Sequence, residues 1–243
     1  MSLAIAWASC AQAAVCDPRA FQGRYGFQLS GTTTISSTPQ PVASVGRLDL
    51  NGSGAITGVS ASIKFAGLLL GNPVTGTYQA QSDCAVSWRL QDTSGNWQHF
   101  EGTMSPGGDR VSFHQSDPGS PRNGIMLRTA QSCTNADFYG IYHYTLSGWD
   151  IDIDTGQIQR KISAVGLMEA DGKGNLRYAP DASTPFRHAG RYEIDNDCFV
   201  KLKWQFPGEA EGSSFRAVLA DGGRQLLGIQ SDPGPVVSLR MAR

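Results

Sequence analysis

Four histidines are the side chains of this chain best suited to acid–base chemistry near neutral pH: His99, His114, His143 and His188. They lie in four separate segments of the sequence. A catalytic or metal-binding cluster would therefore require distant segments to converge, as neighbouring strands of a barrel can. The alternative is a set of single histidines at a surface or rim, and the sequence favours it. We therefore expect no catalytic residue, no metal ligand and no cofactor among them.

Three aspartates at a spacing of two, Asp150, Asp152 and Asp154, resemble the start of a calcium loop, because carboxylates are hard oxygen ligands. An EF-type loop also needs Gly at its sixth position and Glu at its twelfth. This chain has Thr155 and Lys161 there. Isoleucines alternate with the aspartates, which is the period of a strand with one polar face. The pattern therefore favours a hairpin over a calcium site, and no metal site is predicted.

The elements that carry these residues occur twice. The segment CDPRAFQGRYGFQLSG from Cys16 returns 117 residues later as CTNADFYGIYHYTLSG from Cys133. Further segments return in the same order, such as GTYQAQSDCAV from Gly76, which reappears as GRYEIDNDCFV from Gly190. A period of this length is that of a small domain and far exceeds a solenoid repeat. The chain is therefore a tandem duplication.

The cysteines follow the same duplication. Cys16 and Cys84 are 68 residues apart, and Cys133 and Cys198 are 65 apart. Of the three pairings that four cysteines allow, only Cys16–Cys84 with Cys133–Cys198 gives each copy its own bridge. Metal binding is the competing interpretation, but no CxxC or nearby His pattern supports it. Disulfides indicate an oxidising compartment, which makes a secreted or periplasmic location the expectation. The fifth cysteine, Cys10, falls in the leader described next.

Three regions follow from these patterns: 1–14, 15–130 and 131–243. Residues 1–14 are apolar and end in small residues, which is typical of a signal-peptide remnant without its basic start. A disordered tail is the alternative. The net charge of −1 gives no basic footprint for nucleic acid, and no other apolar run approaches a membrane span.

Short alternating segments separated by Gly, Asn, Asp and Pro predict an all-β fold with almost no helix. About eight antiparallel strands per copy are the size of a small closed barrel, with a two-sheet sandwich as the alternative. The fold class is therefore two tandem β-barrels. In the first copy we expect strands near the following residues, and the second copy repeats their order: 20–30, 43–50, 55–64, 75–81, 84–91, 97–104, 109–115 and 123–129.

The combination of Phe-x-Gly-x-Tyr, [Asn/Asp]-Gly-x-Gly, Gly-x-Tyr, Asp-Cys and Ser-Asp-Pro-Gly resembles a group of functionally uncharacterised secreted bacterial β-barrel repeat proteins. Their barrels are broadly similar to the calycin and allene-oxide-cyclase types. The similarity covers nearly all of both copies, but it rests on turn and core residues. It implies the fold and no catalytic residue.

The copies differ most at residues 32–42 and 65–71, and variable loops often carry function. If one copy binds something apolar, Leu68, Leu69 and Leu70 are the expected contacts. The alternative is a buried strand or the surface between the barrels. Polar residues kept in both copies form either two equivalent sites or structural turns, and the sequence favours turns: Asp83 with Asp197, Gln115 with Gln230, Asp117 with Asp232, and Arg128 with Arg240.

These observations favour a secreted, non-enzymatic binding or interaction protein. Its partner would be a small apolar ligand, a glycan or a protein, and neither nucleic acid nor a membrane span is expected. The alternatives are a barrel enzyme of the cyclase or isomerase type, and a structural envelope or matrix component.

Overall fold

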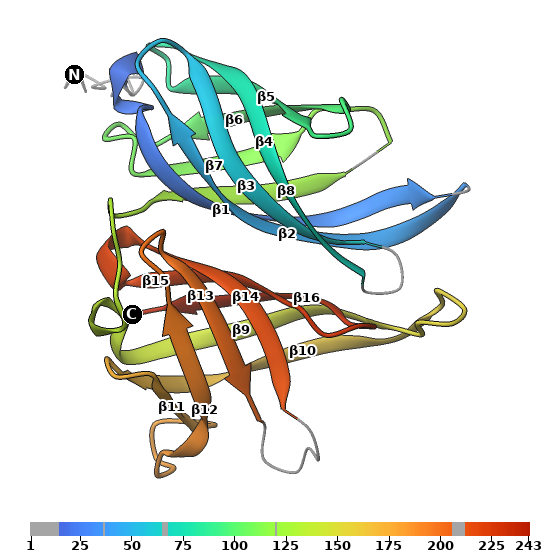
Figure 1. Cartoon of the computed structure of the whole chain (residues 1–243), viewed down its shortest axis with the longest axis vertical. Helices are drawn as coiled ribbons and strands as arrows, with labels where there is room; N and C mark the ends of the chain where they lie inside the picture. The colour runs from blue at the N-terminus through green and yellow to red at the C-terminus, as the bar shows by residue number, and fades with distance from the viewer. Residues whose placement is uncertain (1–14, 36, 65–67, 120, 206–211) are drawn as a thin grey trace, which may run out of the picture.

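The computed structural model describes residues 15–35, 37–64, 68–119, 121–205 and 212–243, and Figure 1 shows two barrels stacked one above the other. Each barrel is closed and has eight antiparallel strands, which confirms the predicted fold class. The expected leader, residues 1–14, lies outside the described residues. The first barrel runs in sequence order through β1 (Gly23–Ile35), β2 (Thr38–Leu50), β3 (Ala55–Lys64), β4 (Leu68–Ala80), β5 (Ala85–Asp92), β6 (Trp97–Met104), β7 (Arg110–Gln115) and β8 (Arg122–Arg128).

The second barrel repeats this order and closes by pairing its last strand with its first. Short 3-10 turns precede each barrel, η1 (Pro18–Ala20) and η2 (Asn135–Asp137), and a third, η3 (Asp221–Gly223), joins two strands. The strands are β9 (Tyr139–Ile151), β10 (Ile158–Asp171), β11 (Asn175–Ala179), β12 (Arg187–Ile194), β13 (Phe199–Trp204), β14 (Ser213–Ala220), β15 (Gln225–Gln230) and β16 (Val236–Ala242).

The expected strands agree with the observed ones except where β1, β2 and β4 are longer. The Thr-, Ser- and Pro-rich run after residue 30 reads as a loop, but it continues the β1–β2 ladder from Gly31↔Val42 to Ile35↔Thr38. β4 begins at Leu68 instead of residue 75. Both hairpins therefore extend the barrel wall at one end, beyond the hydrophobic segments on which the expectation rested.

Aromatic side chains fill both barrel interiors. In the first barrel, the inward faces of the strands bring Phe21, Tyr25, Trp88, Phe100 and Phe113 into one buried cluster. The rings of Trp88 and Phe100 stack at 5.3 Å between centroids. The second barrel has an equivalent cluster that includes Tyr142 and Trp204. Period-two alternation places these residues inside, and their burial supplies most of the driving force for folding.

Each barrel contains its own disulfide, Cys16–Cys84 and Cys133–Cys198, which is the expected pairing. Both bridges tie the segment before a barrel's first strand to the turn before its fifth strand. Cys84 and Cys198 adopt positive φ values of 71° and 64°, a left-handed conformation that non-glycine residues rarely take. The duplication has kept this geometry in both copies.

The two barrels pack through a third apolar cluster. Strands β1, β2 and β8 of the first barrel bury Ala43, Val45, Ile125 and Leu127 against the second. The second barrel contributes residues mainly from β14 and β15, such as Val218, Leu227 and Ile229. The two contact faces come from different strands of the repeat, so the packing is not a symmetric pairing of like surfaces.

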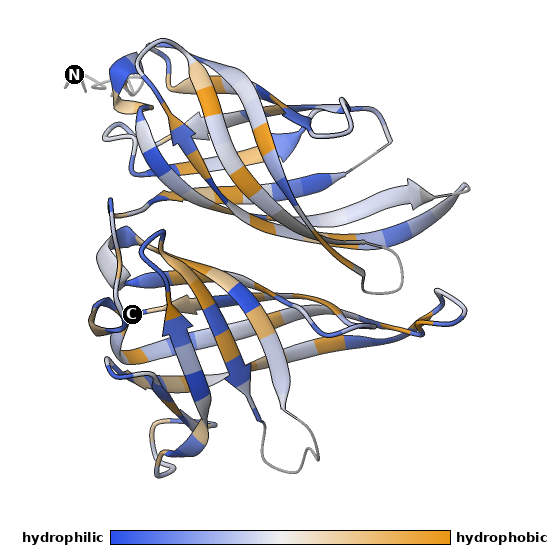
Figure 2. Cartoon of the chain, viewed as in Figure 1, coloured by the Kyte–Doolittle hydropathy of each residue, from blue (hydrophilic) through white to orange (hydrophobic). Residues whose placement is uncertain are grey.

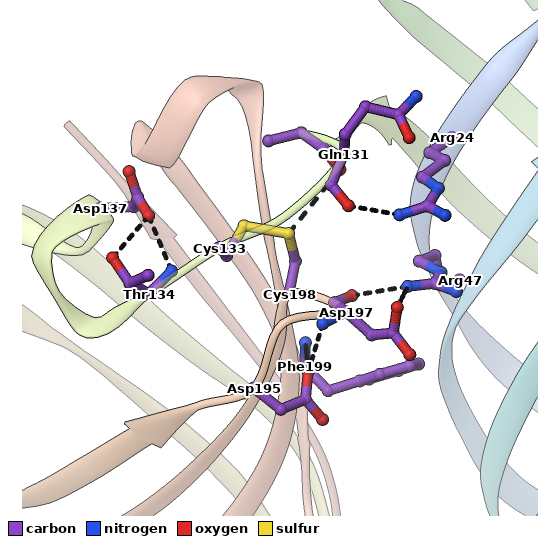
Figure 3. The surroundings of a disulfide bond; sticks show 11 residues. Arg24, Arg47, Gln131, Cys133, Thr134, Asp137, Asp195, Asp197, Cys198 and Phe199 are labelled. Carbon is purple, nitrogen blue, oxygen red and sulfur yellow. Dashed lines mark hydrogen bonds and ion pairs between the residues drawn. A yellow bond between two sulfur atoms is a disulfide. The ribbon is translucent and has the colours of Figure 1, made fainter.

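Polar contacts frame this interface. Figure 3 shows Arg47 of β2 reaching the turn after β12, where its Nη1 lies 2.5 Å from a carboxylate oxygen of Asp197 and 3.0 Å from its carbonyl oxygen. Arg24 donates to the carbonyl of Gln131 beside the second disulfide. Gln28 is 3% exposed and donates to the carbonyls of Gly228 and Leu239. Side chains of the first barrel therefore reach the linker, a turn and two strands of the second barrel.

Within the described ranges, no helix has the length and apolar character needed to cross a membrane.

Candidate functional site

Both barrels carry a shallow groove at the same place on the outer wall. In the first barrel it covers about 830 Å³ over β4, β5 and β6, and in the second about 620 Å³ over β12, β13 and β14. The registers make these strands equivalent, since Tyr78 pairs with Trp88 as Tyr192 pairs with Leu202. The duplication therefore offers an internal comparison of the same surface with different side chains.

The groove of the second barrel is basic. Its outward-facing residues include Arg191, Lys201, Lys203 and Arg216, all exposed. Arg191 lies directly opposite Lys203, and Lys201 lies opposite Arg216. Like charges placed opposite each other destabilise a sheet, so these two pairs of cations lower the stability of the second barrel.

Few anions compensate these cations. None of the four forms an ion pair within the part of the chain that the structure describes. Glu193 is the exposed carboxylate of the same lining, and it lies directly opposite Lys201. Asp232 also lines the groove, but its Oδ2 accepts from the backbone N–H of Ser214 at 2.7 Å and from Gln230 at 3.1 Å. Figure 2 shows the resulting hydrophilic segments, in blue, on the neighbouring strands β12 and β13.

The groove of the first barrel is nearly neutral and holds a histidine–carboxylate pair. Nδ1 of His99 lies 2.8 Å from Oδ1 of Asp117, and the His99 ring is half-exposed. Burial alone would raise the pKa of Asp117, but hydrogen bonds from the His99 backbone, from Gln115 and from the His99 ring outweigh it and lower that pKa. Asp232 accepts the equivalent backbone and glutamine hydrogen bonds in the second barrel, where Ser214 replaces His99. The shared role of this aspartate is thus structural: it caps a neighbouring strand.

A small cavity of about 70 Å³ lies at the mouth of the first barrel. Leu29, Leu90 and Phe100 form part of its apolar lining, and Ser44 and Asn72 are among its polar groups. Arg122, the first residue of β8, also lines it and is 8% exposed. Its Nε is buried without a hydrogen-bond partner.

The three leucines expected to bind a ligand separate in the structure. Leu69 packs against the apolar cluster between the barrels, which was the alternative interpretation of this segment. Leu70 is 45% exposed and lines the mouth cavity. The side chain of Leu68 lies outside what the structure describes.

The aspartate run forms the hairpin between β9 and β10. Asp150 pairs with Arg160, and Oδ1 of Asp152 accepts from the backbone N–H groups of Asp154 and Thr155. In the described ranges, no group of three or more His, Cys, Asp or Glu side chains is placed to hold a metal ion.

The predicted equivalence of Arg128 and Arg240 in the two copies is wrong. Arg128 lies opposite Tyr25, with its guanidinium 5.0 Å from the ring centroid, and it donates to the carbonyl of Gln22. The second barrel places Arg243 in this role, over Tyr142 and donating to the carbonyl of Tyr139. Arg240 lies instead in the interface, where its Nε donates to Gln28. The sequence match was displaced by three residues because a sheet register cannot be counted from a conserved residue type alone.

Sequence reasoning missed the basic groove and Arg122. The groove has a readable signal: the two lysines at alternate positions in KLK must share one face of a strand. Arg122 has none, because an arginine after a Pro-rich turn is ordinarily exposed.

No protein-family model and no curated protein sequence matches the chain. The solved structures similar to it include two of the same kind of protein. Transferrin-binding protein B from serogroup B Neisseria meningitidis is 7% identical with a TM-score of 0.34, over 93% of this chain and 76% of that one. A point mutant of the vaccine antigen transferrin-binding protein B from Haemophilus parasuis Hp5 is 8% identical with a TM-score of 0.30, over 92% and 76%.

Proposed function

We propose that this chain is a non-enzymatic interaction protein of the secreted or periplasmic space that binds an acidic segment of a partner protein in the groove of its second barrel. The observation that carries the proposal is the set of four exposed cations in one groove, none of which forms an ion pair with another described residue. Two disulfides support the oxidising location.

The first barrel supplies the reason to treat these cations as functional. At the positions of Arg191, Lys201 and Arg216 it carries Thr77, Ser87 and Glu101. The position of Lys203 carries Arg89, so the same wall folds with one of the four basic residues. Fold requirements do not explain why the second copy adds three more cations there.

An extended acidic peptide fits the spacing of the cations. Lys201 and Lys203 project from the same face of β13 at a separation of roughly 7 Å, and facing residues on adjacent strands are about 5 Å apart. Alternate side chains of an extended peptide repeat at the same roughly 7 Å. The filled interior of the second barrel favours its outer surface over an interior cavity for a small apolar ligand in that barrel. A glycan is the other partner to be tested, and a structural matrix component is the alternative function.

The His99–Asp117 pair is the observation closest to the enzyme alternative. It lies on an open outer wall, and the aspartate has a capping role that the second barrel repeats without histidine. The resemblance to cyclase-type barrels therefore supplies no site residue, and we retain the interaction function.

Exchange of residues between the copies tests the proposal. A fluorescent ten-residue poly-glutamate peptide is titrated into the full chain at 50 and 150 mM salt. The variant Arg191→Thr/Lys201→Ser/Arg216→Glu imports the first barrel's residues. Each exposed pair contributes about 0.2–1 kcal/mol, so two neutralisations and one charge reversal should weaken binding by roughly 10-fold or more. Higher salt should weaken wild-type binding as well.

The reciprocal variant, Thr77→Arg/Ser87→Lys/Glu101→Arg, should create a second site and raise the stoichiometry from one to two. Peptide affinity that is unchanged in the first variant would refute the proposal. So would tighter binding of a sulfated glycan or of anionic phosphatidylglycerol vesicles than of the peptide.

A further inference from the structure

Arg122 is a buried charged residue at the mouth of the first barrel. Its side chain forms no ion pair among the residues that the structure describes, and its Nε has no hydrogen-bond partner. Burial lowers the pKa of its guanidinium, and the Asp117 carboxylate offsets part of that effect. A buried, unpaired arginine is costly, because its lost hydration is not replaced.

The carboxylates nearest to this region are already engaged. Oδ2 of Asp117 accepts from the His99 backbone and from Gln115, and its Oδ1 contacts the His99 ring. Asp92 lines the same cavity, but it accepts from the backbone N–H groups of Ser94 and Asn96. Arg122 and Asp92 therefore line the same cavity, and the hydrogen bonds that Asp92 accepts hold its carboxylate in the turn after β5.

The fold does not require an arginine at this position. In the first barrel Gly31 pairs with Arg122, and the equivalent Gly148 pairs with Val237 in the second. Val237 is fully buried in an apolar core. The registers also match Leu90 of the cavity with Trp204, which is fully buried in the second barrel. One copy has thus filled its mouth with apolar side chains, and the other has kept a cavity with a cation.

We propose that the mouth of the first barrel is a binding site for a small carboxylate with a short apolar body, and that Arg122 binds the carboxylate. A guanidinium presents two parallel N–H donors that match a carboxylate. The cavity of about 70 Å³ holds one such group, since a water molecule takes up about 30 Å³ of liquid.

The apolar part of the ligand would lie along Leu29 and Leu90 and leave the cavity past Leu70. Of the three leucines selected from the sequence, the site uses Leu70. This ligand site is separate from the basic groove, because the two lie on different barrels and share no residue.

The test uses the full chain and butyrate as the probe. Methyl-labelled NMR should show saturable shifts at leucine and valine methyls of the mouth. The neutral isostere butyramide should bind at least 10-fold more weakly. Arg122→Val, which imports the residue of the second barrel, should reduce butyrate affinity at least 10-fold and leave the melting temperature unchanged or higher. The groove variant Arg191→Thr/Lys201→Ser/Arg216→Glu is the matched control, and it should bind butyrate as the wild type does.

Several results would overturn the proposal. Equal binding of butyrate and butyramide would exclude a role for the charge, and inorganic phosphate that binds more tightly than butyrate would exclude a carboxylate site. Butyrate affinity that persists in Arg122→Val would exclude this residue. A fall in the melting temperature of Arg122→Val, with no butyrate binding by the wild type, would make the arginine structural. Because the control variant changes only the groove, failure of the peptide proposal and failure of this one are distinguishable.

Discussion

Replacement of Gln28 by alanine should weaken the contact between the two barrels and lower the free energy of unfolding. Its Nε2 donates to Gly228 at 2.6 Å and to Leu239 at 2.8 Å, and its Oε1 accepts from Arg240 at 2.8 Å. All three partners belong to the second barrel. Two neutral hydrogen bonds of about 1 kcal/mol each and one charged bond of about 1.5–3 kcal/mol predict a loss of about 3.5–5 kcal/mol for Gln28→Ala.

The free energy of unfolding, measured by urea titration with tryptophan fluorescence, gives the magnitude. Thr145→Ala is the matched control, because Thr145 is the equivalent residue on β9 and is exposed, so its replacement should cost less than about 0.5 kcal/mol. Gln28→Glu keeps an acceptor for Arg240 but loses both donors, and it should also destabilise the protein. If Gln28→Ala costs no more than Thr145→Ala, the idea that buried hydrogen bonds couple the barrels is wrong.

Three further predictions follow from the contacts described. His99→Ser should keep the melting temperature within about 2 °C in a thermal melt, because Ser214 already occupies the equivalent position and its backbone N–H caps Asp232. A hydrogen bond and the charge of Arg47 lower the pKa of Asp197. A lowered pKa contributes stability above the unfolded value near 3.9, and this stability is lost as the pH falls through the folded value. The melting-temperature advantage of the wild type over Asp197→Asn should therefore shrink below about pH 4, and a constant difference would contradict the assignment. Cys16→Ala/Cys84→Ala should lower the unfolding free energy of the first barrel by about 4 kcal/mol in denaturant titrations, since the bridge closes a 68-residue loop.

The barrel fold was readable from the sequence because local and duplicated signals agree. Alternating apolar residues define the strands, Gly- and Asn-rich turns separate them, and the repeat assigns the cysteine pairs. The predictions ended too early where the pattern loses its apolar residues, as after residue 30, although the ladder continues to Ile35↔Thr38. Those strands are extended by backbone hydrogen bonding alone, which a hydrophobic pattern in the sequence does not predict.

The candidate sites were harder to predict because they depend on which face of each strand is free. The alternate lysines of KLK must share a face, but only the closed sheet places β12, β13 and β14 side by side. Burial of Arg122 depends on the extended β1–β2 hairpin, which the sequence analysis assigned to a loop. A charged residue in a turn-rich segment carries no local sign that it will be enclosed.

The unequal packing of the barrels explains why equivalent residues diverged. A Cβ at Gly26 would lie 2.6 Å from a methyl group of Val218 across the interface, so no side chain fits there. Its equivalent on β9, His143, is exposed. The same logic applies to His114 and Ile229, which occupy equivalent positions. Ile229 is fully buried between the barrels, whereas His114 is exposed on the free wall. These histidines therefore mark surfaces that the interface does not use.

This asymmetry also argues against head-to-tail association of copies. Such an assembly would repeat the internal contact by placing the β9–β10 wall of one molecule on the β6–β7 wall of the next. The β9–β10 wall is free to make its side of that contact. Val165 on this wall is 70% exposed, whereas its equivalent Val45 in the first barrel is 1% exposed. The β6–β7 wall is not suited to its side: Ser112 and His114 are polar where Leu227 and Ile229 complete the internal interface. Desolvating those polar groups without new partners would oppose the contact. Ser112→Leu/His114→Ile should therefore promote concentration-dependent association in analytical ultracentrifugation, whereas the wild type should stay monomeric. A wild type that self-associates as readily as this variant would show that the polar wall does not prevent the contact.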